Sequence, residues 1–130
     1  FVGKPTETEE DFQETANFLH RYAHLNKEYM IKIYLTTTFM LLQNSPLVLN
    51  PIYKEKYGLN FDDKDNHFSR FFWTAECNPE NTFPERIKRW KRFVEVMEKL
   101  NYHFAPGTPH EKNKTVLEEV EKAYYEKYGS

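Results

Sequence analysis

The chain of 130 residues is long enough for one domain and too short for two independent hydrophobic cores. Its 18 Lys and Arg against 20 Asp and Glu give a formal net charge of −2, which excludes the overall basic character of a typical nucleic-acid-binding domain. A single cysteine excludes a fold held by intramolecular disulfides. Eleven Phe, nine Tyr and two Trp indicate a core built largely from aromatic rings.

The first helix is expected at 7–25. Thr6 and Glu9 have the spacing of a capping box, and acidic residues follow in the first turn. Apolar side chains then recur at helical spacing, at Phe12, Ala16, Leu19 and Ala23. Residues 1–5 precede this pattern, and we expect them to be a flexible lead-in.

The most apolar segment, 27–43, is expected to be a central helix that is buried on nearly all sides, because it contains few polar side chains. Its β-branched residues also permit a strand, and Ile31, Lys32 and Ile33 alternate as strand residues do. We favour the helix because of the length of the segment and because no partner strand is evident. The segment is too short and too polar to span a bilayer.

Two shorter helices are expected next. Asn50 and Pro51 predict the N-cap and first turn of a helix of about seven residues, which Gly58 ends. The following helix is expected at 63–77, before Asn78 and Pro79.

The clearest helix pattern covers 84–100. Thr82 and Pro84 open it, and its apolar stripe consists of Phe83, Ile87, Trp90, Val94 and Met97. A last helix is expected at 111–128. Together the patterns predict an all-α fold, in which 1–130 form a single helical domain: one compact bundle of about five or six helices with an aromatic-rich core.

One histidine pair has the spacing of metal ligands. His20, His24 and Glu28 are each four positions apart, so on one helix they would share a face. The sequence lacks the Glu that directly follows the first His in zinc-protease helices. We therefore expect these side chains to have a structural role, and we expect no metal and no cofactor.

No pattern in the sequence indicates catalysis. The chain has neither a Gly-x-Ser-x-Gly elbow nor a glycine-rich phosphate loop, and it contains only four glycines. The single cysteine, Cys77, is expected to be buried and inert. We therefore favour a protein that is not an enzyme.

The densest charge cluster lies on the 84–100 helix and comprises Arg86, Lys88, Arg89, Lys91 and Arg92. A basic amphipathic helix can bind nucleic acid or an anionic membrane. Acidic residues four positions away, such as Glu85 from Arg89, would neutralise part of this charge. We therefore expect a solvated face and keep nucleic-acid or anionic-membrane binding as the alternative.

Trp73 projects outside the apolar arc of the predicted 63–77 helix, on the side of Arg70. Such a side chain is either covered by another segment, here 46–50, or exposed as an anchor for a partner. We favour coverage slightly. If it is exposed, Trp73 and Arg70 are expected to define the edge of a partner site. The expected partner-binding residues are Trp73, Arg70, Arg86, Lys88 and Arg89.

By elimination, the sequence predicts a non-enzymatic protein–protein interaction module that is part of a larger protein or assembly. Nucleic-acid or anionic-membrane binding through the basic helix is the first alternative. The second is a metal-binding or small-ligand-binding helical protein that uses His20 and His24. An intracellular location is favoured, although the start at Phe1 rather than Met is compatible with processing of a secreted chain.

Overall fold

The computed structural model describes residues 2–28, 32–33, 37–42, 44–61, 70–104 and 110–129. Most of the regular structure in these ranges is helical, which confirms the prediction of a mostly helical fold. The described residues also form two small two-stranded sheets, in which each strand has two residues.

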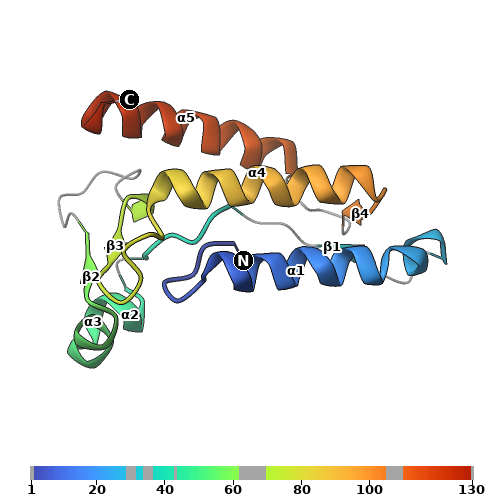
Figure 1. Ribbon diagram of the computed structural model, residues 1–130. Helices are drawn as coiled ribbons and strands as arrows, with labels where there is room; N and C mark the ends of the chain where they lie inside the picture. The colour runs from blue at the N-terminus through green and yellow to red at the C-terminus, as the bar shows by residue number, and fades with distance from the viewer. Residues whose placement is uncertain are drawn as a thin grey trace.

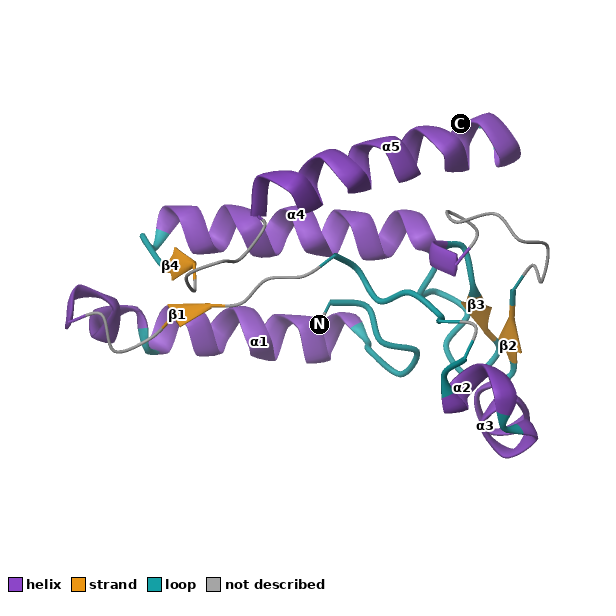
Figure 2. Ribbon diagram, turned by 180° about the vertical axis from the view of Figure 1, so that it is seen from behind, coloured by secondary structure: helices purple, strands orange, loops and turns teal. Residues whose placement is uncertain are grey.

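Three long helices lie side by side, with α4 (Phe83–Lys99) between α1 (Glu9–Arg21) and α5 (His110–Tyr128) (Figure 1). Helices α1 and α4 run in the same direction and α5 runs in the opposite one (Figure 2). The predicted stripe of α4 is buried from Phe83 to Met97. It packs with Phe12 and Leu19 of α1 and with buried residues of α5 in the main core.

The chain enters α1 differently from the prediction. Thr8, rather than Thr6, is the N-cap, and its capping box is completed by Asp11. The helix ends at Arg21 and is followed by the 3-10 helix η1 (Ala23–Glu28). The lead-in is packed rather than free, since Val2 and Pro5 are buried.

The central helix expected at 27–43 is wrong over 32–33 and 37–42, where the described residues are not helical. Strand β1 (Lys32–Ile33) pairs in parallel with β4 (His103–Phe104), and Thr38 forms a parallel bridge with Val2. The partners of this segment come from opposite ends of the sequence, so the local pattern could not reveal them. The remainder, at 29–31, 34–36 and 43, lies outside the described residues.

Two short helices stand at one end of the molecule, beside a small sheet (Figure 1). Helix α2 (Pro46–Leu49) precedes α3 (Pro51–Tyr57), whose predicted cap at Asn50 and end at Gly58 are confirmed. Strand β2 (Leu59–Asn60) then pairs antiparallel with β3 (Thr74–Ala75). The helix expected at 63–77 is therefore wrong over 72–77, and 62–69 lie outside the described residues.

A second, smaller core fills the end that holds α2 and α3. Trp73 is its centre, surrounded by buried Leu41, Leu59 and Ala75. Partly buried Leu47 and Val48 of α2 close it from one side. The two cores meet where Arg86 of α4 lies over the Trp73 ring, with 3.8 Å between the guanidinium carbon and the ring centroid.

Candidate functional site

Trp73, the predicted partner anchor, is completely buried. Its indole Nε1 donates a hydrogen bond to the Phe39 carbonyl oxygen at 3.0 Å. The alternative of coverage is the one that the structure supports, because Leu47 and Val48 pack against the Trp73 core. The exposed-anchor prediction is therefore wrong, and the neighbouring Arg70 is half-buried.

Arg86 is also fully buried and cannot contact a partner from this position. Its guanidinium donates to the carbonyl oxygens of Phe71 at 2.8 Å and Trp73 at 2.9 Å, and also to that of Asn81. Burial lowers the pKa of Arg86 to about 9, so the group is charged at pH 7. Arg86 therefore joins α4 to the segment before it through charge-assisted hydrogen bonds.

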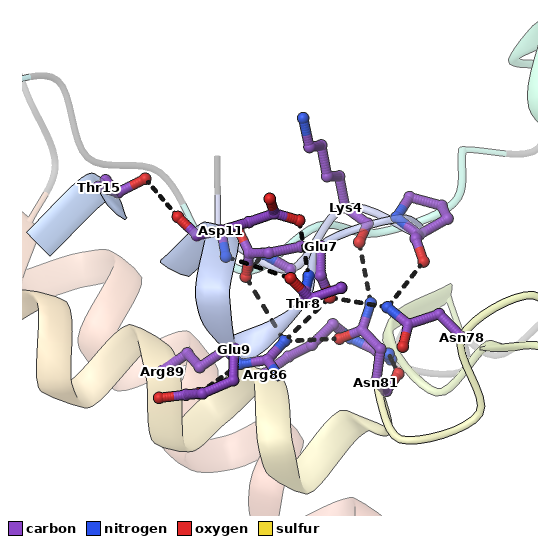
Figure 3. A network of polar contacts seen from close by, with 12 residues as sticks. Lys4, Glu7, Thr8, Glu9, Asp11, Thr15, Asn78, Asn81, Arg86 and Arg89 are labelled. Atoms are coloured by element: carbon purple, nitrogen blue, oxygen red, sulfur yellow. Dashed lines mark hydrogen bonds and ion pairs between the residues drawn. The ribbon is translucent and has the colours of Figure 1, made fainter. Parts of the chain in front are cut away.

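Arg89 is buried as well, inside the polar network of Figure 3. Its Nη1 lies 3.7 Å from the carboxylate of Glu7, and its Nε lies 3.4 Å from that of Glu9. Burial raises the pKa of Glu7, although the Gly3 amide and Arg89 act against this shift. This network fixes the N-terminal segment on α4.

Two asparagines complete the attachment of the N-terminal segment. Asn81 Nδ2 donates to the Lys4 carbonyl oxygen at 2.9 Å, and Asn78 Nδ2 donates to that of Glu7 at 2.7 Å (Figure 3). These bonds satisfy backbone acceptors that a lead-in without regular structure would otherwise leave to water.

The three remaining basic side chains of the predicted cluster have acidic partners. Lys88 pairs with Glu85 at 2.9 Å, and Lys91 pairs with Glu121 of α5 at 3.0 Å. Arg92 pairs with Glu9 of α1 at 2.7 Å. Each cation of the predicted basic cluster is thus engaged within the chain, mostly by partners far away in the sequence rather than four positions away.

The predicted metal ligands are not brought together. His20 and His24 are both exposed, and α1 ends between them at Arg21, so they do not share a face of one continuous helix. Within the described ranges, no group of three or more His, Cys, Asp or Glu side chains could hold a metal ion. The side chain of Glu28 lies outside the described residues. Cys77 is exposed, contrary to the prediction of a buried thiol.

Exposed apolar side chains that were not predicted from the sequence lie on α2, on α3 and just before α2. Four large apolar side chains between positions 42 and 53 are exposed: Leu42 at 48%, Leu49 at 64%, Ile52 at 69% and Tyr53 at 37%. We call these four residues the α2–α3 surface. The Tyr53 ring stacks on that of Tyr57, with 6.4 Å between centroids. Helices this short, each with a proline at its first position, cannot bury apolar side chains on every side. Their shortness, which Pro46, Pro51 and Gly58 indicate, was the signal available in the sequence.

Comparisons with protein-family models, with curated proteins and with solved structures found no match to this chain. Among the described helices, none is both long and apolar enough to cross a membrane.

Proposed function

We propose that the chain is a non-enzymatic protein–protein interaction module that binds its partner through the α2–α3 surface. The observation that carries this proposal is the concentration of exposed Leu42, Leu49, Ile52 and Tyr53 in one short stretch. Clustered exposed apolar side chains are typical of interaction sites, and tyrosine is enriched among the residues that dominate binding energy. In this proposal α1, α4, α5 and their aromatic-rich core form a compact helical scaffold.

The flanking charges favour an acidic partner segment. Lys54 and Lys56 are exposed on α3. The Lys54 ammonium lies 5.7 Å from the centroid of the Phe61 ring, and the Lys56 ammonium lies 5.4 Å from that of Tyr57. Both charges therefore border aromatic surface. We propose a partner segment with an apolar face that carries acidic side chains at its edge.

Nucleic-acid binding through α4 has less support. Affinity for phosphate requires cations that can replace the counterions of the nucleic acid. On α4, Arg86 and Arg89 are buried, and Lys88, Lys91 and Arg92 are paired with carboxylates.

Site-specific photo-crosslinking of the full chain tests the proposal. A benzoylphenylalanine placed at Leu49 or Ile52 should capture the same protein from the native cell, through a peptide that contains acidic and apolar residues. The same group at Phe18, which is 53% exposed on α1, is the matched control and should not capture that protein.

The captured partner then allows an affinity measurement. Ile52→Asp should weaken binding by at least about 2 kcal/mol, the loss typical of a residue that dominates an interface. Its melting temperature should change little, because Ile52 is exposed. Equal capture at Phe18, or unchanged affinity of Ile52→Asp, would contradict the proposal.

A further inference from the structure

The backbone of residues 37–42 is paired along one edge. The Phe39 amide donates to the Val2 carbonyl oxygen at 2.9 Å. Two positions further on, the Leu41 amide donates to the Arg70 carbonyl oxygen at 3.0 Å. Bonds from alternate amides are the pattern of a β-strand, in which successive amides point to opposite edges. Phe39 and Leu41 therefore define the paired edge of a short extended segment.

The opposite edge carries backbone groups without a partner. Met40 and Leu42 alternate with the paired residues, so their amides point the other way. Within the described ranges neither amide has a hydrogen bond, and the Met40 carbonyl oxygen has none either. Both residues keep contact with solvent, since Met40 is half-buried and Leu42 is exposed. An unpaired strand edge is a template for pairing with another chain.

A cavity of about 330 Å³ lies along this open edge. Residues 37–42 line it together with Ser45 and Leu47, and no charged side chain is among them. The two faces of the segment are already occupied, because Phe39 packs against the smaller core and Met40 against the main core. The residues that bond to the paired edge do not line the cavity. The open edge is thus the side of the segment that remains for it.

The segment is held in its extended conformation by the rest of the fold. The Phe39 carbonyl oxygen accepts a hydrogen bond from the Trp73 indole at 3.0 Å. Thr38 forms a parallel bridge with Val2, and Leu41 is buried in the smaller core. A strand that is already fixed on one edge loses little conformational freedom when a ligand binds to the other.

We propose that the open edge at Met40 and Leu42 binds an extended peptide segment of a partner protein as a short added β-strand. The Met40 amide donates to the peptide backbone, and the Met40 carbonyl oxygen accepts from it. Because the cavity lining carries no charge, the segment that fits has uncharged side chains at the positions facing it. This inference is independent of the proposed function, since it uses backbone groups of 40–42 rather than the exposed side chains of α2 and α3.

A blocked pentapeptide of alternating threonine and valine is the probe, because both residues favour strands and carry no charge. Titration of the full chain with this peptide, followed by ¹H–¹⁵N amide shifts, should show saturable changes that alternate along the segment. The amide protons of Met40 and Leu42 should move downfield as they form hydrogen bonds. Those of Phe39 and Leu41, which are already bonded, should move less. A ligand that only fills the cavity would produce no such alternation.

Met40→Pro and Met40→Ala separate the backbone amide from the side chain. Both variants remove the methionine side chain, but only proline removes the amide proton. Proline breaks no hydrogen bond of the free protein here, because the Met40 amide makes none within the described ranges. The probe should bind to Met40→Pro at least about fivefold more weakly than to Met40→Ala, the effect of one lost hydrogen bond.

Methylated peptides give a test that leaves the protein unchanged. One version carries N-methyl groups on its valines and the other on its threonines. Since a strand presents alternate amides to one edge, one version should lose saturable binding and the other should keep it.

Four results would overturn the proposal. They are the absence of saturable shifts over 39–42, shifts that do not alternate between neighbouring amides, equal affinities of Met40→Pro and Met40→Ala for the probe, and an equal effect of the two methylation patterns.

Discussion

Replacing Arg86 with methionine is expected to destabilise the protein by about 3–4 kcal/mol, although methionine is apolar and the site is fully buried. The reason is that the guanidinium supplies donors to three backbone carbonyl oxygens, those of Phe71, Trp73 and Asn81. Methionine replaces much of the aliphatic stem and none of these donors.

The magnitude follows from opposing contributions. Each buried carbonyl left without a donor costs about 1–3 kcal/mol. The lost contact between the cation and the Trp73 ring costs about 2 kcal/mol in a desolvated setting. A buried cation also costs several kcal/mol in lost hydration, and methionine recovers that part. The net loss is a large share of the total stability of a typical domain, which is about 5–15 kcal/mol.

Urea denaturation at pH 7, followed by tryptophan fluorescence, measures this loss, because Trp73 and Trp90 are both buried in the folded state. Arg92→Met is the matched control: it is the same substitution on the same helix, at a side chain that is 44% exposed. It should cost at most about 1 kcal/mol. If Arg86→Met lost no more stability than Arg92→Met, the reasoning about buried carbonyl acceptors would be refuted.

Three further expectations concern the core, a turn and a buried acid. Trp90→Ala should lower the free energy of unfolding by about 3–5 kcal/mol, measured by chemical denaturation, because it leaves a cavity in the main core; an unchanged midpoint would contradict its burial. Gly58→Ala should destabilise more than Gly129→Ala in thermal melts: both glycines have positive φ, but a Cβ at Gly58 would lie 2.5 Å from that of Glu76, whereas one at Gly129 meets nothing within 4 Å. The folded-state pKa of Glu7 is raised, so its contribution to stability is greatest below the ordinary value of 4.5 and is lost as the pH rises through the folded-state pKa. The free energy of unfolding of Glu7→Gln, measured by urea denaturation relative to the natural sequence, should therefore be higher at pH 7 than at pH 4. The opposite trend would show that the ion pair of Glu7 with Arg89 outweighs the effect of its burial.

Where structure depends on neighbouring residues, the sequence predicted it well. Helix α3 begins after Asn50 and ends at Gly58 as expected, because a side-chain cap and a left-handed glycine act within a few residues. The stripe of α4 was also correct, since helical periodicity alone places Ile87, Trp90 and Val94 on one face.

Where structure depends on distant partners, the prediction failed. Ile33 and Thr38 have an extended backbone because they pair with Phe104 and Val2, respectively. No local sequence pattern indicates either pairing. The basic cluster failed for the same reason. Arg89 was expected to be solvated, but it is buried. Its ion pair with Glu7, which precedes α1, offsets part of the cost of burying the charge. The exposed surface on α2 and α3 was missed because apolar residues in short helices resemble core residues in sequence.

The polar attachment of the N-terminal segment has a consequence for the order of events during synthesis. The bond from Asn81 to Lys4 spans 77 positions, and the bond from Arg89 to the Glu7 carbonyl oxygen spans 82. A ribosome adds about 5–20 residues per second, so the segment waits roughly 4–16 s for the side chains that hold it. Throughout that interval the carbonyl oxygens of Lys4 and Glu7 lack the side-chain donors that bind them in the folded protein. The first structured residues of this domain are therefore among the last to reach their final place, and a chaperone or protease that meets the nascent chain encounters them open.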